Sequence, residues 1–143
     1  MRAISNFEEF IRNGIVKKQH SDVSRSKFLK EESIKSYLFL QKKVKVFGIT
    51  NDSSNDIIKS CYDVIMELTR AKMLLKGYNA SGQGAHEAEV SYLRNLGFSE
   101  KEVQFVNQLR YFRNGMLYYG TSLDAEYAHE VIKFTKKIYE ELQ

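Results

Sequence analysis

The chain has 143 residues, of which 43% are hydrophobic and none is proline, and its formal net charge is +4. This composition excludes a disordered chain and favours a helical protein, and the length suits one domain spanning residues 1–143. The single cysteine, Cys61, excludes an intramolecular disulfide. The N-terminus has no apolar segment long enough for a signal peptide or a membrane span, so we expect a cytoplasmic protein without membrane contact.

The first predicted elements are two helices separated by Gly14. Residues 6–13 predict a short helix, and residues 21–47 predict a long one that ends at Gly48. The apolar residues near one face of the long helix are Ile34, Tyr37, Leu38, Val44 and Phe47. Residues 1–48 carry 11 Lys or Arg and 5 Asp or Glu, so this part of the chain is basic. Residues 49–143 carry 11 Lys or Arg and 13 Asp or Glu, so they are slightly acidic. We interpret this basic third as a solvated helix face, with a nucleic-acid surface as the alternative.

The next helix begins at the capping residue Ser53, with Asp56 three positions later, and ends before Gly77. Its apolar stripe is broad, which indicates contact with more than one neighbour. The stripe contains Ile58, Cys61, Ile65, Leu68 and Leu75. Because Cys61 lies among apolar residues, we expect a buried, unreactive thiol.

The second half of the chain predicts one flexible connection, over residues 78–89, and three further helices. A short helix covers residues 86–97, a longer one runs from the N-cap Ser99, with Glu102 at the capping-box position, to Gly120, and the last covers residues 123–143. The apolar face of the last helix contains Tyr127, Val131, Phe134 and Ile138. No strand pattern competes, so the predicted fold class is all-α, an antiparallel bundle of four main helices plus short ones.

The helix between Ser99 and Gly120 has two apolar sides. The predicted core stripe contains Phe105, Leu109, Phe112, Met116 and Tyr119, and the opposite side contains Val103, Val106, Arg110, Arg113, Asn114 and Leu117. Cations among apolar residues suggest a surface that meets another chain or a polyanionic ligand. Val106, Gly115 and Leu117 are therefore candidates for a dimer interface, where Gly115 would allow a close helix approach. The alternative is that the two arginines pair with carboxylates on an adjacent helix.

Three segments together resemble the HEPN domain family: CYDVIMELTRAKMLLKGY, HEAEVSYLRNLG and LRYFRNGMLYYG. The resemblance covers roughly residues 53–143 and implies a helical fold that dimerises. It also implies an Arg and a His that meet across the dimer and cleave RNA without a metal ion. Arg113 matches the family's Arg and Asn114 the polar residue that follows it. In the family the His follows the Arg after four to six intervening residues. Here these positions hold Tyr118, Tyr119 and Gly120, so the His is absent.

The missing histidine separates two functions. Tyrosine is a poor general base near neutral pH, whereas arginine still binds phosphate. The favoured hypothesis is a homodimer that binds a nucleotide or RNA without nuclease activity, with Arg110, Arg113, Asn114, Tyr118 and Tyr119 as candidate ligands. The resemblance also suggests a nucleotidyltransferase partner, as in toxin–antitoxin systems. The alternative is a metal-independent ribonuclease that uses Arg113 with Tyr118 or Tyr119.

The sequence predicts no cofactor and no metal site. His20, His86 and His129 are far apart in the sequence, lie in polar surroundings and lack the spacing of metal ligands. We expect all three at the surface.

Overall fold

The computed structural model describes residues 3–143, so Met1 and Arg2 of the predicted domain lie outside the described residues. The described chain is mostly helical, which confirms the helical fold class, but it also contains two short strands. In chain order the elements are α1 (Phe7–Arg12), β1 (Val16–Lys18), α2 (Val23–Phe47), α3 (Ser54–Leu75), β2 (Tyr78–Ala80), α4 (Ala85–Ser91), the 3-10 helix η1 (Tyr92–Arg94), α5 (Glu100–Tyr118) and α6 (Ala125–Leu142).

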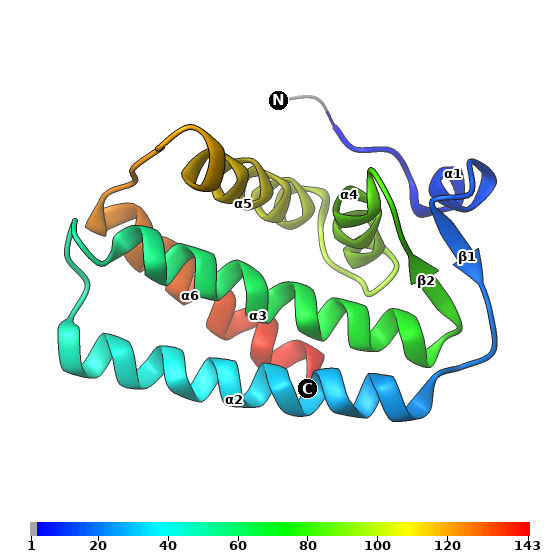
Figure 1. Cartoon of the computed structure of the whole chain (residues 1–143), viewed down its shortest axis with the longest axis horizontal. Coiled ribbons are helices and arrows are strands. Elements are labelled where there is room, and N and C mark those ends of the chain that lie inside the picture. Colours follow the sequence, from blue (N-terminus) through cyan, green and yellow to red (C-terminus); the bar gives the residue numbers. More distant parts are fainter. Residues whose placement is uncertain (1–2) are drawn as a thin grey trace.

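Helix α3 forms the centre of the molecule. It lies between α2 and α5, with α6 packed across it on a further side (Figure 1). This arrangement buries residues around most of the helix, which confirms the broad apolar stripe at Ile58, Cys61, Ile65 and Leu68. Leu75 is the exception, since it is the last residue of the helix and is exposed.

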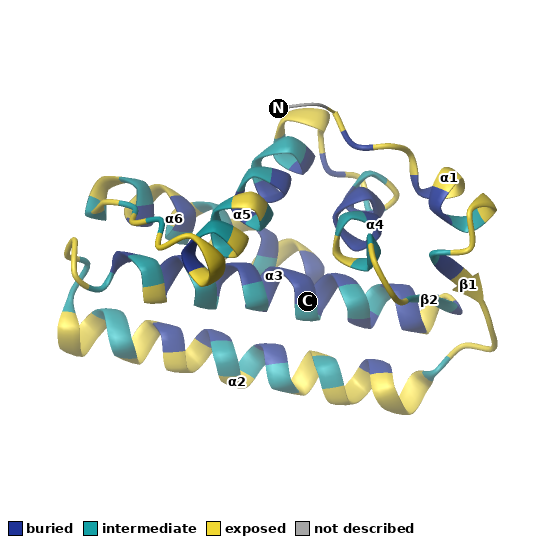
Figure 2. Ribbon diagram, turned by 45° about the horizontal axis from the view of Figure 1, so that its top comes forward, coloured by how far each residue is buried: buried dark blue, intermediate teal, exposed yellow. Residues whose placement is uncertain are grey.

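Helix α2 runs antiparallel to α3 along one edge of the molecule (Figures 1 and 2). Its inner face reaches α6 through Tyr37, whose ring stacks on Tyr139 with the centroids 3.9 Å apart. The buried residues of α2 are Ser26, Ser33, Tyr37 and Leu40. The prediction that Leu38 and Phe47 lie on the inner face of α2 is wrong, because both side chains are exposed.

The two strands correct the prediction of a flexible connection after Gly77. β1 and β2 pair antiparallel, with Val16 opposite Ala80 and Lys18 opposite Tyr78. The backbone N–H of Gln19 extends the pairing by donating to the carbonyl oxygen of Gly77 at 2.7 Å. Three-residue strands carry almost no alternating pattern, so the pairing depends on a partner about sixty positions away and has no local signal.

The N-terminal segment packs against β2 and η1 through aromatic contacts. The ring of Phe7 meets Tyr92 edge-on at 4.7 Å and Tyr78 at 5.1 Å. The guanidinium of Arg94 donates to the carbonyl oxygens of Ile4 and Ser5, each at 2.8 Å. These contacts form a second, smaller core beside the main one.

Helix α5 begins as predicted, with Ser99 and Glu102 forming a capping box. The predicted core stripe is confirmed at Leu109 and Met116, which are buried, but not at Tyr119, which is the exposed C-cap residue. On the opposite side Val103 and Val106 are fully buried as well, because this side packs on α3 and α4. Phe105 and Phe112 are half-buried beside the rings of Phe134 and Tyr127 in α6.

The last helix, α6, begins after the N-cap Asp124, whose carboxylate accepts a hydrogen bond from the N–H of Tyr127. Val131 and Ile138 are fully buried, as predicted. None of the helices described in residues 3–143 combines the length and apolar character that a membrane crossing requires.

Candidate functional site

A polar pocket of about 330 Å³ lies where α3, α4 and α5 meet. The residues that line it come from α3 (Tyr62, Asp63, Met66, Glu67 and Arg70), from α4 (His86) and from α5 (Arg110, Arg113 and Asn114). Three arginines and two carboxylates belong to this lining. We call this the arginine pocket.

Arg113 is held over the pocket by an ion pair with α3. Its Nε donates to Oδ1 of Asp63 at 3.1 Å, and both side chains remain partly exposed. The sequence analysis gave the alternative that the arginines pair with carboxylates on an adjacent helix, and this contact confirms it for Arg113. Because Nε makes the bond, the terminal nitrogens lie at the other edge of the guanidinium, the geometry from which arginine binds phosphate with two parallel bonds.

Arg110 is fixed by its own helix. Its Nε donates to Oδ1 of Asn107 at 2.9 Å, and its guanidinium carbon lies 4.8 Å from the centre of the Tyr111 ring. The cation–π contact restricts the guanidinium, so less conformational entropy is lost when a ligand binds.

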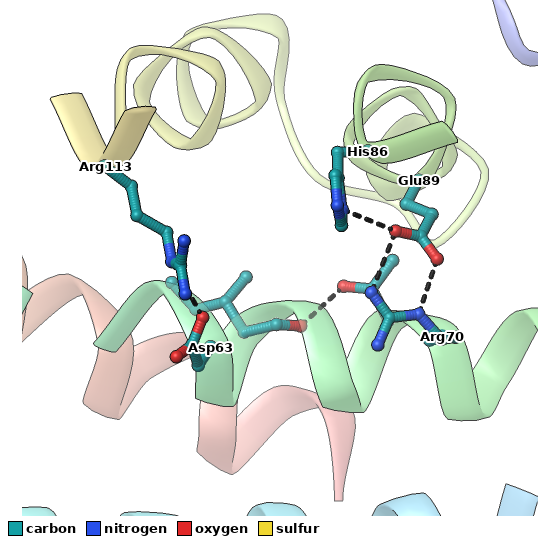
Figure 3. A network of polar contacts seen from close by, with 7 residues as sticks. Asp63, Arg70, His86, Glu89 and Arg113 are labelled. Atoms are coloured by element: carbon teal, nitrogen blue, oxygen red, sulfur yellow. Dashed lines mark hydrogen bonds and ion pairs between the residues drawn. The ribbon is translucent and has the colours of Figure 1, made fainter. Parts of the chain in front are cut away.

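The opposite side of the arginine pocket contains a linked group of Arg70, Glu89 and His86 (Figure 3). Arg70 donates from Nε and from a terminal nitrogen to the two oxygens of Glu89, at 2.6 and 3.0 Å. His86 Nδ1 lies 3.3 Å from Oε1 of the same carboxylate. Figure 3 shows Arg113 and Asp63 across the pocket from this group.

The electrostatics of Glu89 explain why a nearly buried carboxylate stays ionised. Burial favours its neutral form, but the hydrogen bonds from Arg70 and His86 outweigh this effect and lower its pKa. The ionised Glu89 then fixes the imidazole of His86 through Nδ1. Since the His86 side chain is mostly exposed, its Nε2 remains on the solvent side of this contact.

Two other residues of the pocket lining, Tyr62 and Glu67, have polar groups that are partly or fully removed from water. The Tyr62 side chain is buried, and its hydroxyl makes no hydrogen bond to any residue of the described chain. Burial also raises the pKa of Tyr62 above its ordinary value, so the phenol stays neutral. Burial likewise raises the pKa of Glu67, with Asp63 and Glu32 adding negative charge nearby. An unpartnered buried hydroxyl and a half-buried carboxylate are both groups that a ligand can stabilise.

The structure brings together some of the predicted site residues and separates others. Arg110, Arg113 and Asn114 line the arginine pocket together. Tyr118 and Tyr119 lie at the end of α5 with 75% and 85% of their surface exposed, and neither lines the pocket.

Sequence reasoning missed the contribution of α3 and α4. His86 is largely exposed, as predicted, but it belongs to the pocket, and Arg70 and Glu89 were not recognised at all. The spacing of His86 and Glu89, three positions apart in a helix, was the one available signal that they share a face.

The interface candidates also need correction. Val106 is fully buried in its own chain, which removes it as an exposed contact residue, whereas Leu117 is exposed. Gly115 does have a close neighbour, but it belongs to the same chain: a Cβ atom there would lie 2.7 Å from Oγ1 of Thr121. The close approach expected from a second protomer is therefore made by the loop that follows α5.

Comparison with known proteins identifies no relative: no family model, curated protein or solved structure matches this chain. Among the described residues, no three histidine, cysteine or carboxylate side chains are grouped so that they could hold a metal ion. The chemistry of the arginine pocket is therefore argued from its own side chains.

Proposed function

We propose that this protein binds the phosphate group of a nucleotide or of RNA in the arginine pocket. The main support is that Arg110 and Arg113 line one pocket together with Asn114. Two guanidinium groups supply charge and paired donors for phosphate. The side-chain amide of Asn114 can donate and accept hydrogen bonds with a sugar or a base.

The proposal also agrees with the HEPN resemblance, in which Arg113 and Asn114 match the family's Arg and its polar follower. A HEPN-like bundle, homodimerisation and a nucleotidyltransferase partner are further parts of this proposal.

Fluorescence anisotropy with a labelled single-stranded RNA tests the proposal, with AMP and inorganic pyrophosphate as competitors. We expect Arg113→Ala to weaken binding roughly tenfold or more, because a charge-assisted bond is lost, and higher salt to weaken it further. Arg12→Ala removes an exposed arginine outside the pocket and is the matched control. Equal binding by the two variants would contradict the proposal.

The position of His86 favours a second candidate function, a metal-independent ribonuclease. Histidine is the side chain that exchanges protons most readily near neutral pH, and His86 is oriented by Glu89 on the rim opposite Arg113. In this reaction the imidazole takes the proton of the 2′-hydroxyl, and the 2′-oxygen attacks phosphorus. The 5′-oxygen leaves with a proton from water, and Arg113 stabilises the charge that develops on phosphate. His86 would thus take the place first assigned to Tyr118 or Tyr119.

Incubation of the same RNA with the protein and a metal chelator separates the two candidates. Cleavage that is lost in His86→Ala and kept in Tyr118→Phe would support the ribonuclease. Unchanged RNA, with binding that still depends on Arg113, would support binding alone.

A further inference from the structure

The outer side of α2 carries a regular stripe of residues, all of them exposed except Glu32, which is half-buried. The stripe consists of Phe28, Glu32, Lys35, Phe39, Lys42 and Val46, which alternate in steps of four and three positions. Such spacing places all six on one line along a helix, as in the seam of a coiled coil. We call this line the α2 stripe.

The large apolar residues of the α2 stripe are exposed to solvent. Phe28, Phe39 and Val46 have 59%, 60% and 72% of their surface exposed, although large apolar side chains gain free energy from burial. Helices α3 and α6 pack on the other side of α2, which forms the edge of the molecule in both Figure 1 and Figure 2. Three large apolar groups on one exposed line indicate an interaction site.

We propose that the α2 stripe binds the α2 stripe of a second copy of this chain, with the two helices antiparallel about a two-fold axis at the level of Tyr37. In such a pair, residues at equal distances from position 37 meet each other across the axis. Phe28 then meets Val46, Glu32 meets Lys42, and Lys35 meets Phe39 of the copy. Each of these contacts occurs twice.

Every contact in this register is complementary. Phe28 and Val46 form an apolar pair, Glu32 and Lys42 form an ion pair, and the stem of Lys35 covers the ring of Phe39 with its ammonium near the aromatic face. The stripe is roughly 27 Å long at 1.5 Å per residue. The pairing uses no residue that lines the arginine pocket, although Glu32 lies near enough to the lining residue Glu67 to raise its pKa.

Charge also excludes the obvious alternatives within a pair of α2 helices. A parallel pair would set Lys35 against Lys35 and Lys42 against Lys42. An antiparallel pair shifted by one heptad would set Phe28 against Phe39 and Glu32 against Lys35. That shift also sets Arg25 against Lys42 twice and leaves Val46 outside the contact. Like charges opposed in this way are unfavourable, so the register centred on position 37 is preferred.

Sedimentation equilibrium of the full chain, without RNA, tests this pairing from micromolar to millimolar concentration. We expect a reversible dimer that Glu32→Lys and Lys42→Glu each weaken by about tenfold or more, since each creates two like-charge pairs. The double variant Glu32→Lys/Lys42→Glu restores the ion pairs with reversed polarity and should restore the dimer. Phe47→Ser changes an exposed aromatic residue beside the stripe and is the control.

A second double variant, Glu32→Lys/Lys35→Glu, distinguishes the two antiparallel registers, because it restores the ion pairs only in the shifted one. Circular dichroism of each variant checks that the helices still form. A natural protein that stays monomeric over the whole range would overturn the proposal. A dimer that neither single charge reversal weakens would also overturn it, as would recovery in Glu32→Lys/Lys35→Glu instead of Glu32→Lys/Lys42→Glu.

Discussion

Tyr62 combines a structural cost with a position in the arginine pocket. A buried hydroxyl without a partner destabilises a fold by about 1–3 kcal/mol. Tyr62→Phe should therefore leave the free energy of unfolding unchanged or raise it by about 1 kcal/mol, while it weakens RNA binding. Urea denaturation and fluorescence anisotropy measure the two effects. A variant that loses stability and keeps full affinity would show that the hydroxyl serves the fold.

Glu67 gives the pocket a pH dependence. Its pKa is raised in the folded state, mainly by burial, so the neutral form favours folding and the ionised form opposes it. The stabilising contribution is present below the pKa of the unfolded chain and is lost as the pH rises through the folded value. Glu67→Gln should therefore raise the melting temperature at pH 7 and change it little below pH 4. Calorimetry at the two pH values measures this difference, and an equal shift at both would contradict the explanation.

At the scale of single residues, the sequence predicted the arginines of the site but not their surroundings. Arg110 and Arg113 were singled out because cations among valine and leucine are unusual on a helix face, and Asn114 because it follows Arg113 as in the HEPN resemblance. The contacts of Arg113 with Asp63 and of Arg70 with Glu89 span 50 and 19 positions. Such contacts depend on how α3, α4 and α5 pack, which no local pattern encodes.

At the scale of elements, the end of α5 explains its glycine. The backbone N–H of Thr121 turns back to donate to the carbonyl oxygen of Gly115 at 3.1 Å, and the Thr121 side chain fills the space where a Cβ atom would lie. This contact offsets the low helix propensity of glycine.

Gly115→Ala should therefore fail to give the stabilisation of about 1 kcal/mol that an unconstrained helix interior would show. In a Thr121→Ala background the new methyl group loses its closest neighbour, Oγ1, so the same substitution should become less costly. Thermal unfolding of the single and double variants measures the coupling. Additive effects of the two substitutions would show that Thr121 is not the obstacle.

The elements themselves were predicted unevenly. Helix boundaries with strong caps and glycines were found, as at Ser99 and Gly14, because capping chemistry is local. The predicted core stripe of α5 was confirmed at Leu109 and Met116, whereas Val103 and Val106, predicted on a partner surface, pack inside as well. The hydrophobicity of a helix face does not decide which neighbour it meets when both sides are apolar.

At the scale of the whole molecule, Cys61 reports on the main core. The thiol is completely buried, and burial raises its pKa to about 11. A thiol reagent at mildly alkaline pH should therefore label Cys61 only when the core opens, because thiolate and access are both lacking in the folded state. Labelling rates measured against urea concentration should follow global unfolding. Rapid labelling of a chain with native circular dichroism would contradict this prediction.

The strand pair closes the α2–α3 hairpin at its open end. A short loop joins the helices after Gly48. At the other end, β1 pairs with β2, and the N–H of Asp22 donates to the carbonyl oxygen of Leu74 at 3.0 Å. The two helices are thus connected at one end by the loop and at the other by the paired strands. A cut in the loop after Thr50 would leave the strand pairing in place. The two fragments would still share a sheet and a core, so this loop is a natural place to divide the protein into halves that reassemble on mixing.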